Sequence, residues 1–208
     1  EPLDNYDHFL KFIHILTDEH GLNISQRNVT VSTCGIVPGI LDLAEEKLQI
    51  TLALSLHGST QEKRRRLMPI ANKYDLKEVL AACDTYFGKT GRRVTFEYSL
   101  VHGVNDTDSD VEELTAILKP RNCHLNLIPV NPVRERDFVR PSRKNALNFK
   151  NSLEKRGINV TIRREMGSDI DGACGQLRRR YVDASGAEKS TSAAGEHTGG
   201  GQSRPGKP

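Results

Sequence analysis

Short apolar segments typical of buried strands alternate along this chain with segments whose apolar residues have helical spacing. No hairpin signal joins two of the strand-like segments directly. Consecutive strands are therefore expected to run parallel and to be connected through helices. We count about five such strands, too few for a closed eight-stranded barrel. The sequence predicts an α/β fold with mostly parallel strands.

The boundaries of the predicted elements follow from apolar spacing, capping residues and glycine or proline stops. The predicted strands cover residues 28–33, 49–57, 93–100, 124–130 and 159–164. The predicted helices cover residues 6–20, 38–46, 75 to about 90, 108–118 and 142–156. In the first helix, Phe9, Phe12, Ile13 and Leu16 have the spacing of one helical face. The apolar run at 49–57 is typical of a strand buried on both faces of a parallel sheet. Residues 2–5, and the segment from 58 to 74 with its arginine triplet, are predicted as loops.

Composition favours one globular domain followed by a tail. The chain has 208 residues, of which 36% are hydrophobic, and it contains no apolar run of the roughly 20 residues that span a membrane. Residues 184–208 consist mostly of Gly, Ser, Ala, Lys and Pro, which predicts a disordered tail after a domain at 1–183. The chain has no signal-peptide pattern and begins with Glu1 instead of Met, so we interpret it as part of a longer cytoplasmic protein.

Arginine is concentrated in a few places, although the formal net charge is only +3. The clusters are Arg64 to Arg66; Arg134, Arg136, Arg140 and Arg143; Arg163 and Arg164; and Arg178 to Arg180. The forked guanidinium group matches phosphate oxygens, so these clusters are compatible with an RNA partner. They are also compatible with an ordinary solvated surface on which acidic residues lie nearby.

The four cysteines, Cys34, Cys83, Cys123 and Cys174, are far apart and form no CxxC or CxxxCxxC pattern. This spacing excludes a self-contained zinc or iron–sulfur motif within these residues and gives no metal ligands. It also differs from a disulfide scaffold, which favours a reducing compartment. Cys83 lies on the inward side of a predicted helix and Cys123 at the edge of a predicted strand, so both are interpreted as structural.

Cys174 has a different setting, because Gly172, Ala173 and Gly175 leave little side-chain bulk around its sulfur. Glycines also permit the positive-φ backbone of a tight, exposed loop. This setting is typical of a thiol that must be approached closely. From local composition alone, a small buried core residue is an equal alternative.

Polar residues gather where the predicted strands end, which is where α/β folds place their chemistry. These positions are Ser32-Thr33, Ser55-Leu56-His57, Asn105-Asp106, Asn131-Pro132 and Cys174. Together with Glu1-Pro2-Leu3, Asn126-Leu127-Ile128-Pro129 and Asp169-Ile170-Asp171, they make the chain resemble the radical S-adenosylmethionine (SAM) adenine-C2 methyltransferases of 23S ribosomal RNA, the RlmN/Cfr family. The resemblance extends from Glu1 to about Tyr181. It implies an incomplete radical-SAM (β/α)6 partial barrel whose first strands are missing from this chain.

The resemblance also implies SAM as a cofactor. It matches Glu1 to the glutamate that contacts the SAM amino group and Asn131 to an asparagine that contacts SAM. It matches Ser32 and the strand end Ser55, Leu56 and His57 to positions that line the SAM site. Local reasoning leaves ordinary roles open for these residues: strand-end hydrogen bonds for the serines, a core position for His57 and a turn for Asn131.

For Cys174, the resemblance implies covalent catalysis. Its sulfur accepts a methyl group from one SAM, and the resulting thioether loses a hydrogen to the 5′-deoxyadenosyl radical made from a second SAM. The carbon radical then adds to an adenine ring carbon and forms a transient bond between protein and RNA. A mobile loop with small side chains around the cysteine would let its sulfur react first with SAM and then with the adenine.

The chain departs from the family in lacking the CxxxCxxC loop that holds a [4Fe–4S] cluster and the second, resolving cysteine. The cluster ligands are therefore expected upstream of this chain. We expect the isolated 208-residue chain to bind SAM poorly and to be inactive, with an exposed sheet edge that favours aggregation. The expected partners of the longer protein are 23S rRNA, transfer RNA as an additional substrate, and a one-electron reductant such as flavodoxin. A monomer without membrane contact is expected.

Two other functions stay open at this point. The chain could be a truncated, non-catalytic RNA-binding module, which the coding sequence upstream of Glu1 would reveal. It could instead belong to a family member that modifies carbon 8 of adenine, which mass spectrometry of digested ribosomal RNA would distinguish.

Overall fold

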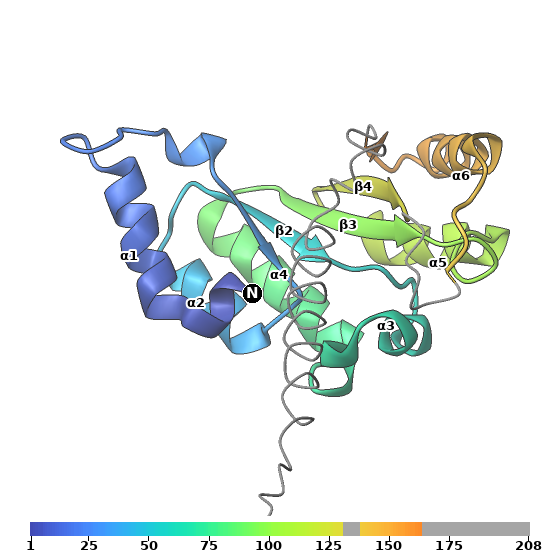
Figure 1. Cartoon of the computed structure of the whole chain (residues 1–208), viewed down its shortest axis with the longest axis horizontal. Helices are drawn as coiled ribbons and strands as arrows, with labels where there is room; N and C mark the ends of the chain where they lie inside the picture. The colour runs from blue at the N-terminus through green and yellow to red at the C-terminus, as the bar shows by residue number, and fades with distance from the viewer. Residues whose placement is uncertain (131–137, 164–208) are drawn as a thin grey trace, which may run out of the picture. The chain divides into compact units, whose positions relative to one another are not determined.

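The computed structural model describes residues 1–130 and 138–163. Within these residues, five strands form one sheet in the order β1-β2-β3-β4-β5, and each neighbouring pair is parallel. The strands are β1 (Thr30–Thr33), β2 (Thr51–Ser55), β3 (Val94–Leu100), β4 (Cys123–Pro129) and β5 (Val160–Ile162). This arrangement confirms the predicted α/β class with parallel strands (Figure 1).

Helices connect the strands, as parallel pairing requires. They are α2 (Val37–Glu45), α3 (Gln61–Leu67), α4 (Leu76–Thr90), α5 (Asp108–Leu118) and α6 (Arg143–Lys155), whereas α1 (Tyr6–Thr17) precedes β1. Short 3-10 helices cover Pro2–Asn5, Gln26–Asn28 and Pro69–Asn72. The predicted tail at 184–208 lies outside the described residues, as does the end of the predicted domain.

Capping residues explain where the helices begin. Asp75 accepts a hydrogen bond from the Glu78 backbone N–H at 2.9 Å, and the Glu78 side chain accepts one from the Asp75 N–H at 3.0 Å. Thr107 forms the same reciprocal box with Asp110 at the start of α5. At its other end, α4 stops at Gly91, which has the left-handed φ of +65°.

Two predictions about the helices are wrong. The segment with the arginine triplet is a helix, α3, instead of a loop, and a 3-10 helix follows it. Thr60 caps α3 by accepting a hydrogen bond from the Lys63 N–H at 3.3 Å. The helix is short and its buried residue is Arg64, so it has no apolar periodicity to detect. In α1, Ile13 is buried but Phe12 is 56% exposed, so the inward face is narrower than predicted.

The sheet has one apolar face and one polar face. Along β3, Val94, Phe96, Tyr98 and Leu100 are buried, whereas the alternate residues Thr95, Glu97 and Ser99 stay partly exposed. The apolar face packs against the helices: the Tyr98 ring stacks on Phe149 of α6 with ring centroids 6.1 Å apart. The prediction that the apolar run at 49–57 is buried on both faces fails at Thr51 and Ser55, which are partly exposed on the polar face.

Tyr86 of α4 fastens that helix to the sheet by donating a hydrogen bond from its hydroxyl to the Ile50 carbonyl at 2.9 Å. Cys83, on the same helix, is 1% exposed and belongs to the core, as predicted. Across the ranges 1–130 and 138–163, no helix combines the length and apolar character needed to cross a membrane.

Candidate functional site

The polar face of the sheet is the first part of the candidate site. Strand register places one row of side chains across it, because paired positions in a parallel sheet point to the same face. This row consists of Ser55, Glu97, Asn126 and Thr161. Ser32, on β1, is exposed on the same face and pairs with Ala53 of β2. Small and polar side chains therefore line a surface that the described helices leave open.

The Glu1 side chain lies at the carboxyl end of β1 and binds the backbone there. Its Oε2 accepts a hydrogen bond from the Cys34 backbone N–H at 2.6 Å, and its Oε1 accepts one from the Leu3 N–H at 3.2 Å. Burial alone would raise the pKa of the Glu1 carboxyl, but hydrogen bonds from Cys34, Thr33 and Leu3 outweigh it and hold the pKa below its ordinary value. Glu1 therefore presents a negative charge at the strand ends.

Arg64 lies beneath this turn. Its side chain is fully buried, and its Nη2 donates a hydrogen bond to the Cys34 carbonyl at 2.7 Å. Gly35 has a φ of +102°, and a Cβ there would come within 2.9 Å of Arg64 Nη2, so glycine is required at this approach. The sequence left Arg64 open as an RNA contact or as part of a solvated surface, and its burial fits neither. Its neighbours Arg65 and Arg66 are exposed.

His57 follows the end of β2 and has a left-handed φ of +55°. Its Nδ1 accepts a hydrogen bond from the Ser99 backbone N–H at 3.0 Å. Burial, together with repulsion from the Arg64 guanidinium, lowers the pKa of His57 to about 4. The ring is therefore neutral at physiological pH.

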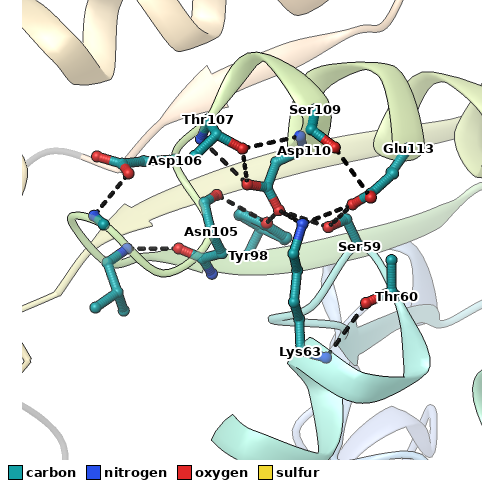
Figure 2. Close-up of polar contacts among 12 residues, drawn as sticks. Ser59, Thr60, Lys63, Tyr98, Asn105, Asp106, Thr107, Ser109, Asp110 and Glu113 are labelled. Carbon is teal, nitrogen blue, oxygen red and sulfur yellow. Dashed lines mark hydrogen bonds and ion pairs between the residues drawn. The ribbon is translucent and has the colours of Figure 1, made fainter.

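A buried polar network holds the loop after β2 against α5 (Figure 2). At its centre, the fully buried carboxylate of Asp110 accepts hydrogen bonds from Ser59 Oγ at 2.6 Å and from Lys63 Nζ at 2.9 Å. Thr107 Oγ1 donates to the same carboxylate at 2.6 Å, and Tyr98 Oη donates at 3.3 Å. These contacts fix the segments on which the candidate site residues lie.

The structure brings several of the predicted site residues together at the carboxyl ends of β1 and β2. Ser32 and Ser55 lie on the open face, and His57 follows Ser55 directly. The Leu56 side chain is fully buried, so only its backbone is available to a ligand. Asn131 and Cys174 lie outside the described residues.

Sequence reasoning missed two residues of this site. Glu97 lies beside Ser55 on the open face, and among the described residues no group donates a hydrogen bond to its carboxylate. Asn105 was noted only as a strand-end residue, yet its side chain is fully buried between the ends of β2 and β3. The alternation of β3 could have identified Glu97, but no local pattern identifies Asn105.

The described residues do not fit an iron–sulfur cluster. Across 1–130 and 138–163, no group of three or more His, Cys, Asp or Glu side chains could hold a metal ion. Cys34, Cys83 and Cys123 are free thiols on separate elements. A ligand with a cationic group and hydrogen-bonding hydroxyls fits better, because Glu1, Ser32, Ser55 and Glu97 offer a carboxylate or hydroxyl at the same sheet face or edge.

Comparison with known proteins gives close relatives. The chain is 63% identical over 183 residues to a protein of Lachnoclostridium phytofermentans named "Probable dual-specificity RNA methyltransferase RlmN", with 88% of this chain and 51% of that protein aligned. A protein of the same name from Clostridium perfringens is 54% identical over 186 residues, with 89% and 54% aligned. The chain spans about half the length of the curated relatives it matches. No family model matches it.

Solved structures agree with this relationship. The crystal structure of a radical SAM methyltransferase from Sphaerobacter thermophilus aligns with a TM-score of 0.81 and 46% identity, covering 85% of this chain and 52% of that one. A domain of a pyruvate-formate lyase-activating enzyme from Bacteroides vulgatus aligns with a TM-score of 0.60 over 79% of this chain and 94% of that one. At 15% identity, this second match shows the fold alone.

Proposed function

The chain belongs to the RlmN family of radical SAM methyltransferases, and from this premise we propose that it is part of an enzyme that methylates RNA with SAM. The observation that carries the proposal is the 63% identity to a relative named as an RNA methyltransferase, maintained over 183 residues. The open polar face of the sheet supports it, because ligands of α/β folds bind at the carboxyl ends of parallel strands.

In this proposal, SAM lies against the polar face and the ends of β1 and β2. The Glu1 carboxylate would accept hydrogen bonds from the SAM ammonium group, since the pKa of Glu1 keeps it ionised. Ser32, Ser55, the Leu56 backbone, His57 and Asn131 would hold the rest of the molecule. SAM, when bound, supplies both the methyl group and the radical chemistry of the family.

Cys174 is proposed as the residue that carries the methyl group to the RNA. Gly172 and Gly175 on either side keep its sulfur open to two different partners. The proposed acceptor is carbon 2 of an adenosine in 23S rRNA, with transfer RNA as a second substrate. The relatives' name, a dual-specificity RNA methyltransferase, is consistent with two RNA substrates.

The cluster that this chemistry requires is proposed to be held by residues upstream of this chain, because the sequence has no CxxxCxxC pattern and the described residues offer no metal site. The isolated chain is then expected to bind SAM weakly and to transfer no methyl group. The full-length protein that contains it is proposed to act in the cytoplasm with a one-electron donor such as flavodoxin.

The proposal is tested by nucleoside mass spectrometry of RNA from a strain that lacks the gene. Complementation with the full-length protein is expected to restore 2-methyladenosine in 23S rRNA, whereas Cys174→Ala does not restore it. Separate digestion of transfer RNA tests the second substrate. The appearance of 8-methyladenosine, or restoration by Cys174→Ala, would refute the proposed chemistry.

A further inference from the structure

One buried side-chain amide, that of Asn105, joins the end of β2 to the end of β3. Asn105, in the loop after β3, donates from Nδ2 to the His57 carbonyl at 2.9 Å and to the Ser99 carbonyl at 2.7 Å. Its Oδ1 accepts a hydrogen bond from the Val101 N–H at 2.7 Å. The side chain is fully buried and uses both of its donors, so it can hold one arrangement of these backbones.

The backbone that Asn105 holds is an unusual one. His57 has a φ of +55°, which non-glycine residues keep only where their surroundings hold them. The Glu97 carbonyl, on β3, accepts a hydrogen bond from the His57 N–H at 3.2 Å. Asn105 holds the other side of the same residue through its carbonyl. The conformation of His57 therefore depends on β3 and on the loop that follows it.

The ring of His57 is constrained as well. Because the Ser99 N–H donates to Nδ1, this nitrogen carries the lone pair, and the neutral ring has its hydrogen on Nε2. Burial and the Arg64 guanidinium from α3 keep the pKa of the ring at about 4, and the acidic residue Glu97 pairs with Ser55 on the neighbouring strand. Among the described residues, no group forms a hydrogen bond with Nε2.

We propose that Asn105 is a positioning residue that, with the Ser99 N–H, presents His57 to the ligand as a neutral Nε2–H donor in a single tautomer. The inference rests on the proposed function, because the ligand is the SAM molecule at the strand ends. Its acceptor is an oxygen or ring nitrogen of the nucleoside part. His57 then binds and orients SAM and takes no part in proton transfer.

The test uses the full-length protein that contains this chain, with ¹⁵N-labelled histidine, and compares two variants. Asn105→Asp keeps the shape and the acceptor for Val101 but removes both N–H donors. Leu153→Ala empties a fully buried position in α6 and serves as the control for lost stability. The readouts are the ¹⁵N shifts of His57, assigned with His57→Gln, at pH 6 and pH 8, and the Kd for SAM from calorimetry.

In the wild-type protein, His57 is expected to show an unprotonated Nδ1 and a protonated Nε2 at both pH values. Asn105→Asp is expected to lose this signature and to raise the Kd for SAM about tenfold or more. Leu153→Ala is expected to change neither the ¹⁵N shifts of His57 nor the Kd for SAM. A ring that titrates between pH 6 and pH 8, or an unchanged Kd in Asn105→Asp, overturns the inference, as does an equal rise of the Kd in Leu153→Ala. A wild-type protein with a fixed ring but no SAM binding refutes the proposed function instead.

Discussion

At the scale of single residues, two charged side chains, Arg64 and Glu1, stabilise the end of β1 through hydrogen bonds to the backbone of Cys34. The buried Arg64 guanidinium bonds the Cys34 carbonyl, and the Cys34 N–H bonds Glu1. Two of the Arg64 nitrogens, Nε and Nη1, have no hydrogen-bond partner within the described residues. Burial raises the pKa of the Cys34 thiol, and with the hydrogen bond and negative charge of Glu1 the pKa reaches about 12. Cys34 is thus a poor nucleophile despite its place beside the candidate site.

Replacing Glu1 with Gln in the full-length protein should make Cys34 more reactive. Removal of the negative charge lowers the pKa of the thiol, so a larger fraction is thiolate at pH 8. Burial remains, so the pKa should stay above that of a free thiol. Labelling by iodoacetamide, followed by peptide mass spectrometry, should become several-fold faster at Cys34.

Cys83 is the internal control for this measurement, because it is 1% exposed and distant in sequence from Glu1. Its labelling should stay slow in both proteins, and faster labelling there would reveal unfolding. An unchanged rate at Cys34 would contradict the coupling between the thiol and Glu1.

Some of these residues could be predicted from the sequence and others could not. Ser32 and Ser55 were identified because they end short strands, and the structure places both on the open face. The burial of Arg64 and the left-handed backbone of His57 depend on contacts between strand ends far apart in the chain. Local patterns carry no information about such contacts.

At the scale of elements, α5 anchors the loop that follows β2. Asp110 is fully buried in the first turn of α5 and receives hydrogen bonds from Ser59, Lys63 and Thr107. Burial alone would raise the pKa of Asp110, but these hydrogen bonds outweigh it and hold the pKa below its ordinary value. The ionised carboxylate therefore stabilises the folded state.

Asp110→Asn should destabilise the protein by about 3 kcal/mol at pH 7. The substitution removes the negative charge that pairs with Lys63, and it places an amide N–H group against side chains that themselves donate hydrogen bonds. The change in the free energy of unfolding is measured by urea denaturation, with circular dichroism as the signal. Glu112→Gln, an exposed change on the same helix, is the matched control and should shift stability by less than about 0.5 kcal/mol. Equal effects of the two variants would contradict the assigned role of Asp110.

The contribution of Asp110 to folding stability should decrease as the pH falls. A lowered pKa in the folded state means that the contribution of Asp110 is complete above the unfolded pKa of about 3.9 and is lost as the pH falls through the folded value. The difference in stability between wild type and Asp110→Asn should therefore shrink below about pH 4. A difference that stays constant from pH 7 to pH 3 would contradict the explanation.

The helices that the sequence predicted well are those with apolar periodicity, and they include α2, which has no side-chain cap. Helices α4 and α5 begin after Asp75 and Thr107, and the structure shows a capping box at each. Helix α3 has a cap at Thr60 but no apolar stripe, since its buried side chain is that of Arg64. A pattern based on hydrophobicity cannot detect a helix that buries a charge.

At the scale of the whole molecule, the sheet has one packed face and one open face. Its apolar face packs under the helices, whereas its polar face carries the row from Ser55 to Thr161. The sequence predicted parallel strands correctly, but the apolar run at 49–57 suggested cover on both faces. Only the three-dimensional register reveals which side stays open, because strands that are distant in the sequence contribute neighbouring side chains.

The most direct measurement is a structure of the cluster-loaded, full-length protein with SAM bound. The account predicts SAM on the polar face, with its ammonium group within hydrogen-bond distance of the Glu1 carboxylate and its nucleoside beside Ser55 and His57. SAM bound elsewhere, or a polar face filled by the protein's own side chains, would contradict it.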